Sequence, residues 1–224
     1  MKYLAIFDLD GTIADTICDL GDAVNYGLEK LGCPTHDYTA YKRMVGNGAK
    51  KLCFRALPEN KQDKAEELYL MFKEYYSHHY LDKTKLYDGM KETMEKLQNN
   101  GVILAVVTNK PEDAARKIVA KLLPDINFLC VLGGSDKRPL KPDPAAIFEI
   151  YSLLPDEEEF FVEMIGDSNV DVMTACNADI RFIGCSWGFR GREELEACIR
   201  ECNRWLYSSI AEKPSDIADI ILYD

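Results

Sequence analysis

Hydrophobic and polar positions form alternating blocks along most of this 224-residue chain. Apolar runs typical of strands cover residues 3–7, 102–107, 128–132, 160–165 and 180–185. Between them, apolar residues recur every three or four positions, as on one face of a helix, over residues 90–99, 112–123, 144–154 and 169–178. Strands that alternate with helices predict an α/β fold, a doubly wound parallel sheet with helices on both faces.

One long stretch interrupts this alternation. After residue 15 no strand pattern returns until about residue 102, and helical patterns cover residues 17–31 and 59–81. We therefore expect an α/β core made of residues 1–15 and 85–224, and an inserted helical cap made of residues 16–84. A further helical pattern over residues 192–207 precedes a closing helix and predicts either a dimer contact or a packed surface helix.

The first apolar run ends at two acidic residues, Asp8 and Asp10. Carboxylates this close repel each other unless a cation lies between them. Mg²⁺ takes oxygen ligands, and one or two carboxylates with a substrate phosphate suit it. Asp8 and Asp10 are therefore candidate magnesium ligands. The alternative is an acidic turn in which aspartate and glycine serve only as turn formers.

Three more polar clusters follow later elements. Thr108 and Asn109 end the second apolar run, Lys141 stands ahead of a helical pattern, and Asp167 and Asp171 follow the run over 160–165. In open α/β sheets, ligands bind beyond the carboxyl ends of the strands, so the clusters are expected to meet there. Taken singly, residues 108–111 are equally a strand end with turn formers, and Lys141 is equally a surface lysine.

In this order the clusters resemble the motifs of the haloacid dehalogenase superfamily of aspartyl-phosphate phosphohydrolases: Asp8-Leu9-Asp10-Gly11-Thr12, Thr108, Lys141-Pro142 and Gly166-Asp167-Ser168-Asn169-Val170-Asp171. The resemblance spans nearly the whole chain. The segments 45–49, 108–111 and 186–190 resemble the branch of phosphoglycolate phosphatases. A Rossmann-like core with a small inserted cap is the fold that this resemblance implies.

The resemblance also implies the reaction, a magnesium-dependent hydrolysis of a phosphomonoester, with 2-phosphoglycolate as the first expected substrate. Asp8 is then the nucleophile that forms an aspartyl-phosphate, and Asp10 is the general acid and base. The Asp8 side chain, the Asp10 main-chain carbonyl and Asp167 are the expected metal ligands. Asp171 is expected to steady either a bound water or Lys141.

The transferring phosphoryl group and the leaving group need separate partners. Thr108, the Asn109 amide and Lys141 are expected to bind the phosphoryl oxygens, because phosphoryl transfer depends on positioning and charge stabilisation. In proteins of this resemblance, a cap turn such as Gly46-Asn47-Gly48 dips toward the site and helps to select the substrate. The flanking cations are candidate partners of a substrate carboxylate, or ordinary surface charges: Arg43 and Lys50.

Related activities remain as alternatives. They are hydrolysis of pyrophosphate, a nucleoside monophosphate or a sugar phosphate, a phosphosugar mutase, and a phosphonate hydrolase, which needs a cap lysine such as Lys50 or Lys51 as a Schiff base. A dehalogenase is disfavoured because it needs no metal and lacks the second acid that Asp10 supplies. A non-catalytic interaction protein is disfavoured because the set of acidic and cationic residues is complete.

The composition limits the classes of molecule that the protein is expected to bind. A net charge of −11 argues against a nucleic-acid groove or an anionic membrane surface, since both need clustered lysine and arginine. An anionic substrate, a small phosphorylated metabolite, must therefore rely on local cations. The eight cysteines form no Cys-x-x-Cys pair, and no leader or apolar run of membrane length occurs. We expect a cytoplasmic monomer or homodimer with reduced thiols.

Overall fold

The computed structural model describes residues 2–155 and 157–223. A six-stranded sheet has the order β5-β4-β1-β6-β7-β8, and all its strand pairs are parallel. Its strands are β1 (Lys2–Phe7), β4 (Ile103–Pro111), β5 (Phe128–Gly134), β6 (Phe160–Gly166), β7 (Arg181–Cys185) and β8 (Ser208–Ala211). The predicted parallel α/β sheet is confirmed.

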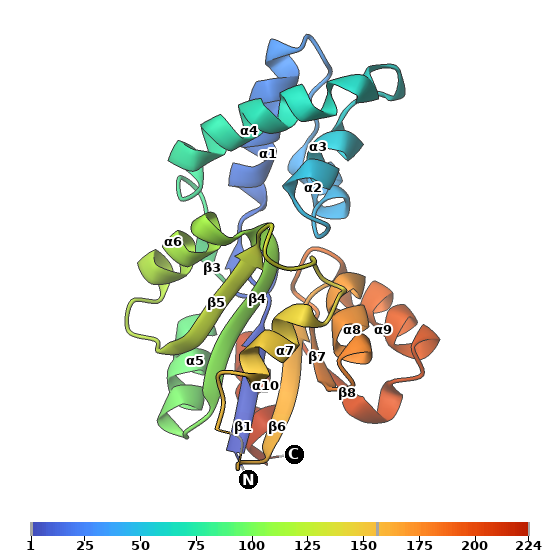
Figure 1. Cartoon of the computed structure of the whole chain (residues 1–224). Coiled ribbons are helices and arrows are strands. Elements are labelled where there is room, and N and C mark those ends of the chain that lie inside the picture. The colour runs from blue at the N-terminus through green and yellow to red at the C-terminus, as the bar shows by residue number, and fades with distance from the viewer. Residues whose placement is uncertain (1, 156, 224) are drawn as a thin grey trace.

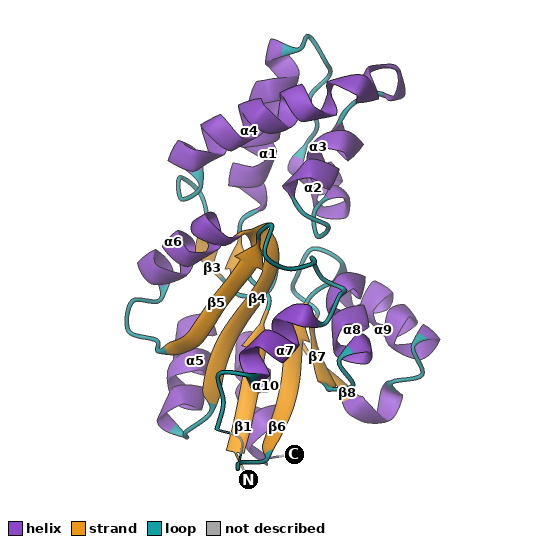
Figure 2. Ribbon diagram, in the orientation of Figure 1, coloured by secondary structure: helices purple, strands orange, loops and turns teal. Residues whose placement is uncertain are grey.

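Helices cover both faces of this sheet (Figure 2). The alternation along β1 explains why, since Ala5 and Phe7 pack on one face and Leu4 and Ile6 on the other. The first face holds α5 (Met90–Asn99), α6 (Glu112–Leu122) and α10 (Pro214–Tyr223). The second holds α7 (Ala145–Tyr151), α8 (Asn169–Asn177) and α9 (Gly191–Glu201). The sheet is therefore doubly wound, as predicted.

Four further helices lie beyond the carboxyl ends of the strands (Figure 1). They are α1 (Ile17–Lys30), α2 (Tyr38–Met44), α3 (Ala49–Ala56) and α4 (Ala65–His79). We call them the cap helices, and they enclose an apolar cluster of their own that includes Leu28, Tyr41 and Leu68. The helix expected over 59–81 is divided, because Glu59–Lys64 is a 3-10 helix and the α-helix begins at Ala65. The domain limits at 15/16 and 84/85 stay a prediction.

A short ribbon joins the cap helices to the core. Strands β2 (Ala14–Asp15) and β3 (Lys85–Leu86) pair in antiparallel fashion where the chain leaves the core and returns to it. Beside the ribbon, the buried Asp19 carboxylate of α1 accepts hydrogen bonds from the Lys83 amide at 2.9 and 3.1 Å and from the Thr84 amide at 2.9 Å. Strands of two residues leave no periodic pattern, so the sequence did not predict this ribbon.

The segment 192–207 differs from the prediction of one continuous helix. Helix α9 ends at Glu201, Asn203 adopts a positive φ of 51°, and Trp205–Tyr207 forms a 3-10 turn that leads into β8. Leu206, placed by the pattern on the apolar face, is 92% exposed. Leu195, Cys198 and Ile199 are buried against the sheet, which favours the packed helix over the dimer contact. Among the helices described, none is long and apolar enough to cross a bilayer.

We expect Asp19→Ala to lower the free energy of unfolding by about 2–4 kcal/mol, because the Lys83 and Thr84 amides lose their acceptor. Urea denaturation measures this difference. Asp22→Ala is the matched control on the same helix, since Asp22 pairs with Lys83 at an exposed position and its loss should cost no more than about 1 kcal/mol. Equal losses in the two variants would show that the carboxylate tie does not stabilise the junction.

Candidate active site

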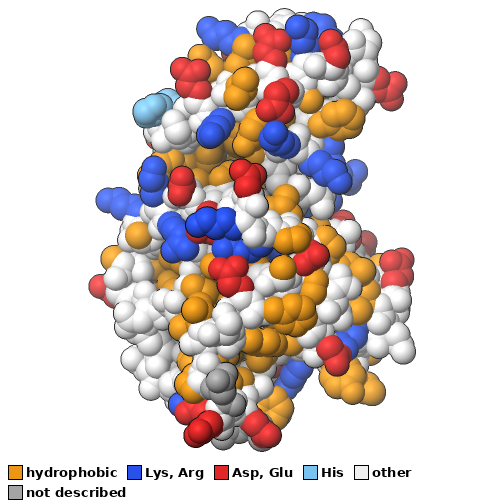
Figure 3. All heavy atoms as spheres, viewed as in Figure 1, with side chains coloured by type: hydrophobic (Ala, Val, Ile, Leu, Met, Phe, Trp, Pro, Cys, Tyr) orange, Lys and Arg blue, Asp and Glu red, His pale blue; other side chains and the backbone are white. Residues whose placement is uncertain are grey.

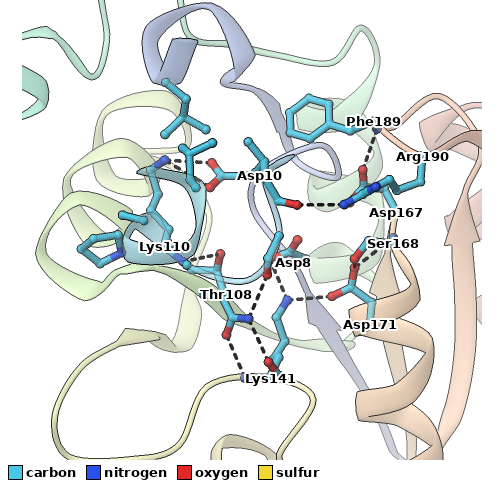
Figure 4. A pocket seen from close by; sticks show the side chains of 18 of the residues that line it. Asp8, Asp10, Thr108, Lys110, Lys141, Asp167, Ser168, Asp171, Phe189 and Arg190 are labelled. Atoms are coloured by element: carbon cyan, nitrogen blue, oxygen red, sulfur yellow. Dashed lines mark hydrogen bonds and ion pairs between the residues drawn. The ribbon is translucent and has the colours of Figure 1, made fainter. Parts of the chain in front are cut away.

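Three buried carboxylates meet at the carboxyl ends of β1 and β6 (Figure 4). Asp8 follows β1, Asp167 follows β6, and Asp171 lies in the first turn of α8. One oxygen from each lies within 4.8 Å of the other two. Asp171 is held in place by the N-terminus of its helix, because the Ser168 amide and hydroxyl both donate to Asp171 Oδ2, at 3.1 and 2.7 Å.

One ammonium group lies among these carboxylates. Lys141 Nζ is 2.8 Å from Asp8 Oδ1 and 2.7 Å from Asp171 Oδ1, and its side chain is 3% exposed. The Asn109 side chain fixes the Lys141 backbone, since its Oδ1 accepts from the Lys141 amide at 2.8 Å and its Nδ2 donates to the Lys141 carbonyl at 3.0 Å. The same Nδ2 lies 2.9 Å from the Gly46 carbonyl of the cap. Only the Asn109 main-chain amide entered the sequence hypothesis.

The electrostatics of this cluster are unbalanced. Burial raises the pKa of Asp8 to about 6, with the Asp171 carboxylate adding to the rise and Lys141 opposing it. Burial, then Asp171 and Asp8, hold the pKa of Asp167 well above its ordinary value. Burial alone would lower the pKa of Lys141, but Asp171 and Asp8 outweigh it and raise that pKa. Three carboxylates against one ammonium leave excess negative charge in a buried site.

This excess fits a divalent cation. The donor set consists of carboxylate oxygens, which suit Mg²⁺ and offer nothing to softer metals. Asp167 is closely packed as well as acidic: a Cβ added at Gly11 or Gly188 would collide with its side chain. The Phe189 amide donates to Asp167 Oδ2 at 2.6 Å. Asp8 and Asp167 are thus oriented side chains that could hold the ion.

Asp10 lies outside this cluster and pairs with a different lysine. Lys110 Nζ contacts Asp10 Oδ1 at 2.9 Å and Oδ2 at 3.2 Å. The Lys110 side chain is 1% exposed, and its ammonium lies 4.8 Å from the centroid of the Tyr76 ring on α4. The sequence hypothesis assigned no role to Lys110 or Tyr76, although residues 108–111 were part of the resemblance.

A cavity of about 40 Å³ lies between the cap helices and the strand ends. Core and cap both line it, with Asp8, Asp10, Thr108, Asn109, Lys110, Lys141, Asp167 and Asp171 from the core and Val45, Gly46, Gly48, Leu52, Phe72 and Tyr76 from the cap. The structure therefore brings the predicted core residues to one cavity. Gly46 and Gly48 of the predicted cap turn lie there as well.

Three of the predicted cap residues, Arg43, Asn47 and Lys50, do not line this cavity, and their role in selecting the substrate stays a prediction. Arg43 and Lys50 are exposed, and Lys50 pairs with Glu66 at 3.2 Å. Asn47 Oδ1 accepts from the Arg55 guanidinium at 2.7 Å. The physical reason for Lys50 is helical geometry: Ala49 lines the cavity, and the next position on a helix points about 100° away.

Arg190 lines the cavity, whereas Arg43 and Lys50 do not. Within the described part of the chain, it is the one guanidinium group that lines the cavity. Its Nη2 donates to the Val45 carbonyl at 2.9 Å, and its carboxylate neighbour, Glu194, is 3.9 Å away. The segment 186–190 was singled out by resemblance, but sequence alone could not show that its last residue reaches under the cap.

Comparison with known proteins agrees with this geometry. A family model described as "Haloacid dehalogenase-like hydrolase" matches residues 5–185. The chain belongs to this family. The family and the named relatives identify it as a phosphatase enzyme.

Several curated relatives are named phosphoglycolate phosphatase. The protein of Pseudomonas syringae pv. tomato is 36% identical over 202 residues, covering 84% of this chain and 71% of the relative. That of Pseudomonas fluorescens is 35% identical and covers 97% of this chain and 83% of the relative. A crystal structure described as a putative phosphoglycolate phosphatase from Lactobacillus delbrueckii subsp. bulgaricus aligns over 100% of both chains with a TM-score of 0.88 and 30% identity.

We expect Asp8→Asn to stabilise the metal-free protein at neutral pH. Because the folded pKa of Asp8 is raised to about 6, its contribution to stability is present below the ordinary value of 3.8 and is lost as the pH rises through 6. The variant should match the wild type near pH ~4 and be more stable near pH ~7, by on the order of 2–3 kcal/mol. Denaturant unfolding in chelator at both pH values measures the difference. A difference that stays constant with pH would contradict the prediction.

Proposed function

We propose that this phosphatase is a magnesium-dependent phosphomonoester hydrolase that acts through an aspartyl-phosphate on Asp8 and converts 2-phosphoglycolate to glycolate and phosphate. The observation that carries the proposal is the buried cluster of Asp8, Asp167 and Asp171 around Lys141 at the strand ends. The relatives named phosphoglycolate phosphatase support the choice of substrate.

The proposed chemistry has two displacements. Asp8 attacks the phosphorus and forms an acyl phosphate, while Asp10 gives a proton to the departing alkoxide oxygen. Asp10 then takes a proton from a water molecule, the water oxygen attacks the phosphorus, and the bond to Asp8 breaks. Asp8, Asp167 and the Asp10 carbonyl would hold magnesium, whose positive charge would let a carboxylate approach a phosphate.

Lys141 and Thr108 are the proposed partners of the transferring phosphoryl oxygens, together with the Asn109 amide. Lys141 is suited to this role because its carboxylate neighbours keep it protonated. Asp171, in contact with Lys141 at 2.7 Å, holds the ammonium in place, which is one of the two roles predicted for it. These side chains recognise a phosphoryl group but not the alcohol attached to it.

We propose residues 16–84 as the cap domain and the cavity walls as the source of selectivity. A second cavity of about 540 Å³ lies between α4 and α6, and Lys73, Lys117 and Lys137 are among its lining residues. Figure 3 shows lysine and arginine side chains around the junction of the cap and the core on this face. The same cavity is also lined by Glu112, Asp113 and Asp136, so its charged side chains balance one another.

Arg190 is the proposed partner of the glycolate carboxylate. It faces the cavity from the core, and its neighbouring carboxylate, Glu194, is too far for a strong ion pair. A phosphonate hydrolase is disfavoured, because Lys51 is exposed and Lys50 lies outside the cavity lining. The cavity lysines, Lys110 and Lys141, have raised pKa values, whereas a Schiff-base lysine needs a lowered one.

The first test is a substrate panel with magnesium, comparing 2-phosphoglycolate with sugar phosphates, nucleoside monophosphates, pyrophosphate and phosphonoacetaldehyde. We expect the highest kcat/KM for 2-phosphoglycolate, complete loss of phosphate release in chelator, and recovery when magnesium is restored. Asp8→Asn should release no phosphate while keeping its far-ultraviolet circular dichroism. Turnover in chelator or in Asp8→Asn would contradict the mechanism, and a different preferred substrate would replace phosphoglycolate alone.

The second test addresses the carboxylate. Arg190→Met should lower kcat/KM for 2-phosphoglycolate by about 10- to 100-fold, the range expected when a charge-assisted hydrogen bond is lost. 2-Hydroxyethyl phosphate, which has the same size but no carboxylate, should be hydrolysed almost as by the wild type. Arg43→Met and Lys50→Met are matched controls in which a cation is removed outside the cavity. Equal losses on both substrates would exclude Arg190 as the carboxylate partner.

A further inference from the structure

We propose that Lys110 is a positioning residue that sets the orientation of the Asp10 carboxylate for proton transfer, with the Tyr76 ring shielding this pair from water. The inference rests on the proposed role of Asp10 as general acid and base. It gives a role to two residues, Lys110 and Tyr76, to which the sequence hypothesis assigned none in the site.

The contact between Lys110 and Asp10 restricts the orientation of the Asp10 carboxylate. Lys110 Nζ contacts both oxygens of Asp10, at 2.9 and 3.2 Å. In Figure 4 the Asp10 carboxylate points toward Lys110, while Asp8 points toward the ammonium of Lys141. A carboxylate held through both oxygens cannot rotate freely about its last bond, so Lys110 determines which oxygen faces the cavity.

Both partners have fixed backbones. The Gly11 amide donates to the Ala14 carbonyl at 2.9 Å, and Asp10 forms a bridge with Ala14, so the loop that carries Asp10 is closed on itself. Lys110 lies within β4, and its amide donates to Thr108 Oγ1 at 3.3 Å. Rotation about its side-chain torsions is therefore the main conformational freedom left to Asp10. The Lys110 ammonium restricts this rotation.

The Tyr76 ring lies against the Lys110 ammonium. Its centroid lies 4.8 Å from Lys110 Nζ, and Phe72 stacks on it at 5.1 Å. A cation against an aromatic face is favourable, and it is most favourable where water is excluded. The Lys110 side chain is only 1% exposed, so the Asp10 carboxylate and the Tyr76 ring replace water around its ammonium. Lys110 and Asp10 are thus held in one relative geometry, whereas a solvated ion pair would adopt several.

Leaving-group chemistry separates this role from a structural one. Phenyl phosphate and p-nitrophenyl phosphate are similar in size and carry no carboxylate, but phenoxide needs a proton to depart much more than nitrophenoxide does. The ratio kcat/KM covers the steps up to departure of the alcohol and excludes the later attack by water. We expect Lys110→Met to lower kcat/KM for phenyl phosphate by about 100-fold, the scale of general acid catalysis, and that for p-nitrophenyl phosphate by no more than a few-fold.

The pair of Asp10 and Lys110 variants tests whether Lys110 acts through Asp10. Asp10→Asn should show the same leaving-group dependence, and adding Lys110→Met to Asp10→Asn should change nothing further. If Asp10→Asn affects both esters equally, the proposed role of Asp10 fails, and with it this inference. If Asp10→Asn discriminates but Lys110→Met lowers both esters equally, only the role of Lys110 is overturned.

Two further comparisons control for loss of structure. Arg138→Met removes a buried cation that is paired with Glu112 at 2.8 Å and does not line the catalytic cavity, and it should destabilise the protein without changing the ratio between the two esters. Tyr76→Leu should increase leaving-group discrimination by about 5-fold, and Tyr76→Phe, which keeps the ring face, should not. This Tyr76 pair tests the proposal even if Lys110→Met does not fold, and equal behaviour of Tyr76→Leu and Tyr76→Phe would overturn the shielding role.

Discussion

Repulsion among buried carboxylates is the constraint on which the rest of this structure depends. Asp8, Asp167 and Asp171 lie together with one ammonium, and their surroundings hold them there at a cost in stability. The parallel sheet makes the arrangement accessible, because strands β1 and β6 are neighbours and end side by side. The stored electrostatic imbalance is also what prepares the site for a cation and a phosphoryl group.

Two lysines divide the acidic groups of the site into two sets. Lys141 neutralises part of the charge on Asp8 and Asp171, and Lys110 is paired with Asp10. The proposed nucleophile, Asp8, and the proposed acid, Asp10, therefore have different lysines as counter-ions, although both line one cavity. Asn109 connects the first set to the cap through Gly46, and Tyr76 connects the second to the cap through α4. Each set thus has its own contact with the cap helices.

Sequence reasoning succeeded where a signal was local or periodic. The run ending at Asp8 and the helical spacing over 90–99 predicted β1 and α5 within a residue or two. It failed where tertiary structure decides. Leu206 was placed on an apolar face, but Asn203 ends the helix before it, and β8 gains its place only by pairing with β7. Likewise, nothing local distinguishes Arg190 from Arg43, since reach across the cavity depends on where the cap helices lie.

Both covalent connections between the core and the cap helices pass through the ribbon of β2 and β3, and the Asp19 carboxylate binds the amides of Lys83 and Thr84 beside it. A two-stranded connection of this kind acts as a hinge, and a residue of the cap helices is displaced further the farther it lies from the hinge axis. Tyr76 lies near the end of α4 from which the chain returns to the ribbon, whereas Gly46 lies in the turn between α2 and α3, on the side of the cap that faces the core (Figure 1). A rotation about the ribbon would therefore strain two hydrogen bonds of this turn, from Asn109 to the Gly46 carbonyl and from Arg190 to the Val45 carbonyl, together with the contact of Tyr76 with Lys110.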